Sequence, residues 1–376
     1  MSENMEQFSP ELPSSSPLIP SLPDDVTVDI VARVPISHYP TLSLVSKKFR
    51  KLIASPNLYK RRSFLGITQH RVYAILRNRS YSGDCRFYIL HRKLDCCSSN
   101  HHRLVIVRSL PPMSYRASFA SVGSKIYVFN EVDALSIDCN SHTVQPISDM
   151  PQRFSSSPMS SIVANVIGGK VYLIGDSAVV TSGGMSWRKT VMVLDTETQT
   201  WEPVVMVKQD MRVGALWSGA VVMEDKICMK GYRNKQRSFV YGPEGNKWES
   251  MGEVMNSKEW GEGACVVDDV LYYLDCSEKA LRAYDPKQSR LSVVDGLEEF
   301  LACECVMSEL PNVVKSGEKK MALFFPKKHD GKEVICCAEI ALERHQGGEI
   351  WGKVKWCDVV VEDGLFDIVN CVAVTV

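Results

Sequence analysis

The amino-acid sequence predicts a small all-α bundle followed by an all-β propeller of about six blades. Apolar residues recur with helical spacing between residues 22 and 64, and this spacing is absent beyond residue 70. There, short apolar strands recur between turns rich in Gly, Asp, Asn and Ser, which is the pattern of antiparallel β structure. The 376 residues, 45% of them hydrophobic, suffice for one large core and a small extra domain, because single cores rarely exceed ~250 to 300 residues.

The charge balance disfavours nucleic acids and membrane surfaces as partners. Lys and Arg total 44, as do Asp and Glu, so the chain has no net field to concentrate an anionic partner. Two short basic runs, at residues 47–51 and 60–62, are expected to be solvated helix faces rather than a nucleic-acid or import patch. No apolar run approaches the ~18 residues of a membrane span. We therefore expect neither kind of partner.

The cysteines indicate a reducing compartment. Thirteen cysteines are dispersed along the chain, and no secretory signal pattern is found at the N-terminal end. Disulfide frameworks are typical of short secreted chains with an even number of cysteines. We therefore expect a cytoplasmic or nuclear location, or both.

The N-terminal region is expected to contain a leader and three short helices. Residues 1–20 hold four prolines and a serine triplet, a composition that predicts a disordered leader. The first helix is expected between Pro23 and Pro35, because apolar residues recur there every fourth position. Two further helices are expected over residues 42–52 and 55–64. A bundle of only about 45 residues is marginally stable, so its exposed apolar residues are expected to need a partner.

A repeated hairpin dominates the rest of the chain. Similar strands begin at residues 125, 170, 226 and 270, and each follows a two-residue turn and an earlier apolar strand. The turns are Gly123-Ser124, Gly168-Gly169, Glu224-Asp225 and Asp268-Asp269. A period of about 40 to 50 residues is typical of propeller blades, and each hairpin is expected at the centre of one blade. Flanking copies at residues 71–76 and 320–325 bring the count to six.

A second signature follows these hairpins. A strand enters a tight polar turn, and an aromatic or aliphatic residue anchors the next, outer strand, as at residues 193–201, 240–248 and 283–291 and more weakly at 136–144. The longest interval between repeats is attributed to a surface insertion at residues 182–186. The segment from Val354 to Val376 is expected to supply outer strands or to close the ring. Whether the last strand pairs with the first blade is left open.

The segment from Leu22 to Ile53 resembles the F-box, through the order and spacing of residues 22–26, 30–35 and 44–53. Ser46 stands where Cys is common and Phe49 where Trp is common, although Phe49 keeps an aromatic anchor. We therefore expect an F-box at residues 21–66.

The repeats resemble the kelch blades of the plant F-box/kelch family. Tyr284-Asp285-Pro286 and the positions of Trp201 and Trp248 carry much of this likeness. Most blades lack the double glycine expected after the second strand of the hairpin, since Asn130-Glu131 and Lys230-Gly231 stand there. We therefore expect a kelch-repeat propeller at residues 67–376.

The resemblance implies a non-catalytic substrate receptor of a cullin-RING ubiquitin ligase, without a cofactor. The F-box would bind a Skp-type adaptor, which docks on a cullin, and the propeller would bind a target protein. Helix-packing interfaces are built around aliphatic and aromatic anchors. We expect seven residues to contact the adaptor: Leu22, Pro23, Ile30, Val34, Leu44, Val45 and Phe49. Val26, Leu42 and Leu52 are instead expected in the core of the bundle itself.

Two tryptophans are candidates for contact with the target. Trp217 and Trp260 each precede an inner strand of a blade, near the expected mouth of the propeller, and Arg212 and Glu259 are their polar neighbours. Packing between blades explains both tryptophans equally well. The sequence leaves these two interpretations open, and it does not identify the target.

Two other classes of function remain as alternatives. A metal-dependent propeller enzyme would need converging His, Tyr, Cys or carboxylate ligands. Cys96-Cys97 with His101-His102 lack the usual spacer between zinc ligands, so an exposed loop is expected there. Cys303, Cys305 and Cys336-Cys337 are expected within apolar strands as small hydrophobic residues. We therefore expect no metal. The remaining alternative is a kelch scaffold protein with no ligase role.

Overall fold

The computed structural model describes residues 18–19, 21–80, 84–94, 100–155, 157, 161–181, 184–207, 216–232, 237–258, 260–261, 263–304, 311–362 and 365–376. All but Leu18 and Ile19 of the expected leader lie outside this set. The chain divides into two compact units, Met1–Thr68 and Gln69–Val376, whereas the sequence placed the division between residues 66 and 67. We call them the helical unit and the propeller.

The helical unit contains α1 (Asp24–Arg33), the 3₁₀ turn η1 (Ile36–His38), α2 (Tyr39–Val45), α3 (Lys47–Ile53) and α4 (Pro56–Phe64). The expected middle helix is therefore two helices. Ser46 separates them, because its backbone is extended at φ −160° and ψ 163°. Its Oγ accepts a hydrogen bond from the Phe49 N–H at 3.2 Å, which is the geometry of a helix N-cap. The cap therefore starts a new helix, α3, within the segment where the apolar spacing predicted one continuous helix.

Arg62 occupies the core of the helical unit, so the expectation that residues 60–62 are solvated is wrong for this residue. It is 0% exposed, and its Nη1 donates to the carbonyl oxygens of Ala32 at 2.6 Å and Val34 at 2.8 Å. These carbonyls lie at the C-terminal end of α1, where helical acceptors lack partners within the helix. Arg62 therefore joins α4 to the end of α1. The neighbouring Arg61 is half-exposed and pairs with Asp29.

The propeller consists of four-stranded antiparallel units. The first contains, from the inside outward, β25 (Phe366–Thr375), β1 (His70–Asn78), β2 (Cys85–Leu94) and β3 (Asn100–Ile106). The second contains β4 (Ser118–Val122), β5 (Lys125–Phe129), β6 (Ala134–Asp138) and β7 (Thr143–Pro146). The third contains β8 (Val163–Ile167), β9 (Lys170–Thr181), β10 (Gly184–Asp195) and β11 (Thr200–Trp201), with β12 (Val205–Met206) also paired to β10.

The fourth unit contains β13 (Trp217–Met223), β14 (Lys226–Gly231), β15 (Phe239–Gly242) and β16 (Lys247–Ser250). The last two contain β17 (Cys265–Val267), β18 (Val270–Asp275), β19 (Ala280–Asp285) and β20 (Arg290–Asp295), then β21 (Asn312–Gly317), β22 (Lys320–His329), β23 (Lys332–Arg344) and β24 (Ile350–Val361). A short parallel pairing of β20 with β24 joins these two into one eight-stranded sheet. The short helices α5 (Glu253–Asn256) and α6 (Glu298–Glu304) connect blades. Counted this way, the described sheets form six blades.

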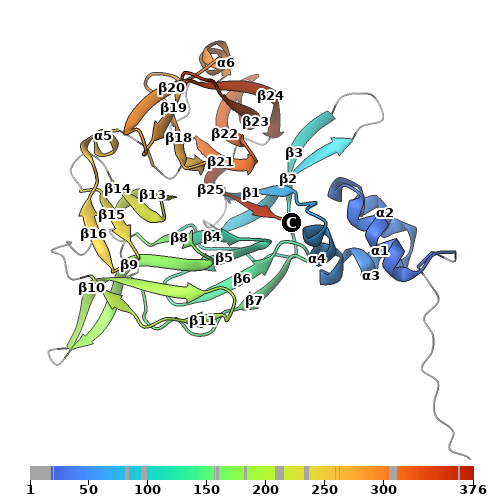
Figure 1. The fold of residues 1–376 in the computed structure, drawn as a ribbon, viewed down its shortest axis with the longest axis horizontal. Helices are drawn as coiled ribbons and strands as arrows, with labels where there is room; N and C mark the ends of the chain where they lie inside the picture. Colours follow the sequence, from blue (N-terminus) through green and yellow to red (C-terminus); the bar gives the residue numbers. More distant parts are fainter. Residues whose placement is uncertain are drawn as a thin grey trace, which may run out of the picture. The chain divides into compact units, whose positions relative to one another are not determined.

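The C-terminal strand closes the ring. The inner strands contact one another in the order β25, β4, β8, β13, β17, β21 and back to β25. Figure 1 labels β25, β4, β8, β13 and β21 around the centre of the propeller. β25 pairs with β1 from His70↔Thr375 to Asn78↔Phe366. This pairing answers the question that the sequence left open. It also gives β1 a partner on its inner edge, which would otherwise be unpaired.

The predicted turns are formed as expected. At Glu224-Asp225 both residues have positive φ, 49° and 55°, as a two-residue type I′ hairpin requires. In the second signature, the Asp195 carboxylate accepts hydrogen bonds from the backbone N–H groups of Glu197 and Thr198. The expected insertion at residues 182–186 differs: Gly184 already belongs to β10, so β9 and β10 are long strands. Residues 182–183 lie outside the described set.

Aromatic residues from the second signature pack within and between blades. The ring of Trp201 lies edge-on to Phe129 of the preceding blade at 6.3 Å between centroids, and its Nε1 donates to the Ser148 carbonyl. Trp248 lies 4.7 Å from Tyr241 in its own blade. Such aromatic pairs contribute beyond the area they bury, so Trp201 helps to hold two neighbouring blades together, and Trp248 helps to hold the outer strands of its own blade.

Candidate functional site

The helical unit exposes several large aliphatic side chains. Leu44 is 76% exposed and Val45 is 65% exposed, both on α2, and on α1 Ile30 is 47% exposed. Val26, which the sequence placed in the core, is 40% exposed on the same helix, so that expectation is wrong. Large aliphatic side chains that stay exposed on short helices are candidates for a protein interface. We call Val26, Ile30, Leu44 and Val45 the exposed aliphatic set.

The other expected adaptor contacts have structural roles as well. Leu22 is half-buried, and its N–H donates to the Ile19 carbonyl at 3.0 Å. Pro23 is exposed and is the N-cap of α1 rather than its first helical residue. Val34 and Phe49 are half-buried. The Val34 carbonyl accepts a hydrogen bond from Arg62, and the Phe49 N–H donates one to Ser46. Leu52 is buried in the core, as expected, whereas Leu42 is half-buried.

The propeller contains a cavity of about 1140 Å³ lined by residues from all six inner strands, which we call the axial channel. The two-residue turns after the inner strands mark one end, the turn end. Thr375 lies there, because its N–H donates to the carbonyl of the turn residue Gly123 at 2.9 Å. The segments that lead into the inner strands mark the opposite end, the loop end. Tyr115 and Arg116, just before β4, line this end.

The loop end presents an aromatic ring with two guanidinium groups close to it. Tyr115 is 47% exposed, and its ring centroid is 5.6 Å from Cζ of Arg77 and 5.5 Å from Cζ of Arg116. Arg116 Nε also donates to the Tyr115 hydroxyl at 3.1 Å, and its Nη1 lies 3.7 Å from Glu131. The sequence did not single out these residues. Their signal is positional, since Tyr115 and Arg116 precede an inner strand, as Trp217 and Trp260 do.

The two candidate tryptophans differ from each other. Trp260 is 1% exposed and its Nε1 donates to the Met255 carbonyl at 3.1 Å, so packing explains this residue and a position facing the target does not. Trp217 lines the axial channel but is only 4% exposed, and Nζ of Lys189 lies 4.2 Å above its ring. Their expected polar neighbours, Arg212 and Glu259, lie outside the described residues.

Beneath Trp217 lies a buried ion pair. Lys189 Nζ is 3.0 Å from Asp176 Oδ1, and the two side chains are 2% and 0% exposed. Burial lowers the pKa of Lys189, and the nearby Asp176 carboxylate opposes this shift. Thr190 beside Lys189 donates to Ser177 Oγ at 2.8 Å. A buried charge is tolerated only with a partner, so Lys189 must stay close to Asp176. These contacts hold the long hairpin of the third blade against the Trp217 ring.

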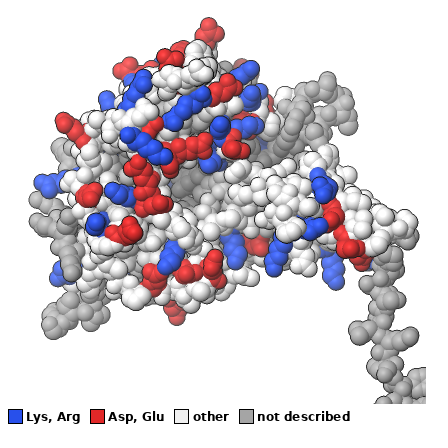
Figure 2. All heavy atoms as spheres, viewed as in Figure 1, with Lys and Arg blue, Asp and Glu red and all other residues white. Residues whose placement is uncertain are grey.

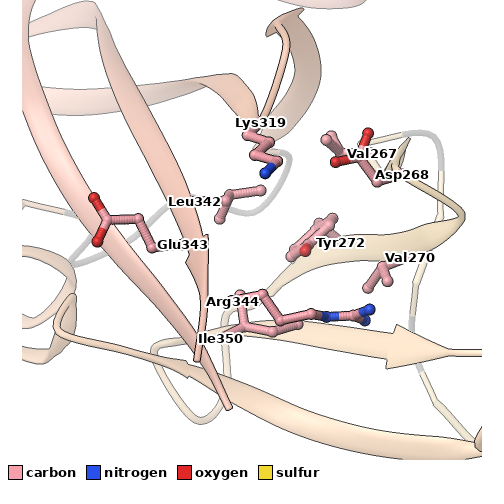
Figure 3. Close-up of a pocket in the computed structure, with 9 residues that line it drawn as sticks. All are labelled: Val267, Asp268, Val270, Tyr272, Lys319, Leu342, Glu343, Arg344 and Ile350. Atoms are coloured by element: carbon pink, nitrogen blue, oxygen red, sulfur yellow. The ribbon is translucent and has the colours of Figure 1, made fainter. Parts of the chain in front are cut away.

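A smaller cleft of about 240 Å³ lies between the fifth and sixth blades (Figure 3). Its floor is apolar, with Val267, Val270 and Tyr272 each at most 4% exposed. Charged residues surround this floor: Asp268, Lys319, Glu343 and Arg344. The volume is below the ~300 to 1,000 Å³ of small-molecule sites, so the cleft is a surface feature of this blade junction rather than a complete ligand site.

The residues considered for metal binding have other environments. His102 belongs to β3 rather than to a loop, its Nδ1 lies 2.8 Å from Asp358 Oδ2, and its ring stacks on Trp356 at 3.7 Å. Cys303 lies in α6, not in a strand, and Cys96, Cys97 and Cys305 lie outside the described residues. Cys336 and Cys337 are buried in β23. Among the described residues, no three His, Cys, Asp or Glu side chains are grouped to hold a metal ion.

The surface of the molecule carries charged side chains of both signs, as the balanced composition predicts. On the face in Figure 2, basic and acidic side chains are interspersed over much of the surface. Lys47, Lys48, Arg50 and Lys51 are exposed on α3, as expected for a solvated face. No helix in the described part of the chain has the length and apolar character to span a membrane.

Comparisons with known proteins place both units in one family. The F-box domain family matches residues 19–61, and the FKB95 Kelch-repeats domain family matches residues 87–361. The Arabidopsis thaliana F-box/kelch-repeat protein At4g38940 is 42% identical, covering 95% of this chain and 94% of the relative. The F-box/kelch-repeat protein At4g39240 of the same plant is 33% identical, covering 97% and 93%. The chain therefore belongs to the F-box/kelch-repeat protein family.

Proposed function

We propose that this chain is the non-catalytic substrate receptor of a Skp-cullin-F-box ubiquitin ligase, acting in the cytoplasm, the nucleus or both. The helical unit binds a Skp-type adaptor, and the propeller binds the target protein. The F-box and kelch-repeat matches are consistent with such a receptor. The observation that carries the proposal is the exposed aliphatic set, because Leu44 and Val45 remain 76% and 65% exposed in a folded helix. An adaptor that buries them removes apolar surface from water.

Adaptor binding tests this proposal directly. The full-length chain is co-expressed with a Skp-type adaptor and compared with a Leu44→Asp, Val45→Asp variant. We expect stoichiometric co-purification of the wild type. The double variant should bind at least ~100-fold more weakly, because each central interface residue contributes about 2 kcal/mol or more. Helical circular dichroism should stay unchanged, since both side chains are exposed.

Val132→Asp is the matched control, because Val132 is 52% exposed on the propeller and should not affect adaptor binding. Failure of the folded wild type to bind would refute the receptor function and favour the scaffold alternative. A bound metal with turnover would favour the enzyme alternative. Retained binding by the double variant would show that the adaptor contacts other residues.

We further propose that the target contacts the loop end of the axial channel. The exposed Tyr115 and the half-exposed Arg116 support this, since aromatic and Arg side chains at the mouth of a cavity are typical interface anchors. A Tyr115→Ala, Arg116→Ala variant should lose the proteins that the wild type enriches in quantitative proximity labelling. Trp351→Ala is the control, because Trp351 is 44% exposed on the outer strand β24 and does not line the channel. Identical enrichment in all three proteins would contradict this assignment.

A further inference from the structure

The two ends of the axial channel differ in how their polar side chains are used. At the loop end, Arg116 lies near Glu131, and Ser161 Oγ accepts a hydrogen bond from the Trp217 N–H at 2.9 Å. Arg116 therefore has a carboxylate nearby and Ser161 has a backbone donor, while Nε1 of Trp217 has no hydrogen-bond partner among the described residues. The loop end therefore has little uncompensated charge on the channel wall.

At the turn end, the polar side chains have no such partners. His70, Ser121, Lys315 and Thr375 line this end, and their side chains make no hydrogen bond or ion pair with any residue that the structure describes. Lys315 is half-buried two residues before the end of β21. His70 lies opposite Thr375 in the β1–β25 pair. The four residues thus come from four different parts of the chain, β1, β4, β21 and β25.

Electrostatics gives this end a single sign. Burial lowers the pKa of His70, and the positive charge of Lys315 lowers it further. The lowered pKa favours the neutral form of the His70 imidazole, so Lys315 is the basic side chain at this end. Of the acidic residues, only Glu131 lines the channel in its described part, and it follows β5 at the loop end. A half-buried ammonium without a carboxylate is left without compensation for the water it has lost.

We infer that the turn end of the axial channel binds a small anion through a carboxylate or phosphate group, with Lys315 as its counter-ion. The hydroxyl groups of Ser121 and Thr375 and the His70 imidazole can add hydrogen bonds, and bonds to a charged group are the stronger ones. The volume of about 1140 Å³ accommodates small-molecule ligands, whose sites span ~300 to 1,000 Å³. Neither adaptor nor target binding as proposed above requires this site.

Calorimetric titration of the full-length chain tests the inference. Inorganic phosphate and citrate are the probes, at one ionic strength set with NaCl, and the comparison between them distinguishes phosphate from carboxylate recognition. We expect saturable binding by the wild type. Lys315→Met should bind at least about tenfold more weakly, because it loses a charge-assisted hydrogen bond. Lys319→Met is the matched control, because Lys319 lies in the turn after β21 and faces the cleft in Figure 3.

Thermal unfolding without ligand checks the fold of Lys315→Met, whose melting temperature should be at least that of the wild type. A lower melting temperature would mean that Lys315 stabilises the empty channel and would overturn the inference. No saturable binding of either anion by the wild type, or equal affinity of Lys315→Met, would overturn it as well. Adaptor binding by the helical unit is measured separately, so the two proposals fail independently.

Discussion

At the residue scale, the buried Arg62 has two opposing effects on the stability of the helical unit. Its Nε and Nη2 have no hydrogen-bond partner among the described residues, and a buried charge with unsatisfied donors is costly. Its Nη1, however, bonds to the Ala32 and Val34 carbonyls and, at 3.3 Å, to the Tyr39 hydroxyl. The guanidinium also lies 5.7 Å from the Tyr39 ring centroid. The net effect of Arg62 on stability therefore depends on whether its hydrogen bonds to the Ala32 and Val34 carbonyls outweigh the cost of burying its charge.

We expect Arg62→Met to destabilise the helical unit by about 1 to 3 kcal/mol, because buried carbonyl oxygens lose their donor. Hydrogen exchange of the α1 and α4 amides is the measurement, and protection should fall in both helices together. Arg61→Met is the control, since Arg61 pairs with Asp29 at the surface and should change little. Protection equal to or above that of the wild type would mean that desolvation of the guanidinium outweighs its hydrogen bonds.

Individual functional residues differ in how far the sequence predicts their position. Leu44 and Val45 were identified because they lie in the segment that resembles the F-box, whose resemblance implies contact with an adaptor. Trp217 and Trp260 were selected for position alone, and position does not determine whether a ring faces a cavity or a neighbouring blade. Lys315 and His70 are 245 positions apart in the sequence, and only closure of the ring brings them to one end of the channel.

At the element scale, local chemistry overrides periodicity in specific places. The two-residue turns were predictable because Gly and Asp tolerate the positive φ that type I′ hairpins need. The split between α2 and α3 was not, because the apolar spacing continues across Ser46 while its hydroxyl caps a new helix. Likewise, residues 184–186 read as a polar loop, yet they pair with Val179–Thr181 of β9. Cross-strand hydrogen bonds determine that hairpin, and they cannot be inferred from composition.

At the scale of the whole molecule, closure of the ring depends on one strand that is distant in sequence from its partner. Residues 366–375 pair with residues 70–78, and the backbone groups of Gln69 and Val376 bond to each other in both directions at 2.8 and 2.9 Å. Contacts so far apart in sequence form late and cost loop entropy. The first blade is therefore complete only when the last strand has joined it.

Two aspartate substitutions on opposite faces of β25 test whether closure of the ring stabilises the propeller. One places the charge in the core of the propeller, and the other places it in the axial channel. Val374 is 1% exposed, so Val374→Asp buries a carboxylate without a partner, at a cost of several kcal/mol. This is a large part of the ~5 to 15 kcal/mol that stabilises a typical domain. We expect a markedly lower melting temperature and loss of amide protection in β1 and β4. Thr375→Asp, one position along, lies in the channel near Lys315 and His70, so it should melt close to the wild type. Equal melting of the two variants would mean that the six blades hold together without the strand that joins the ends of the ring.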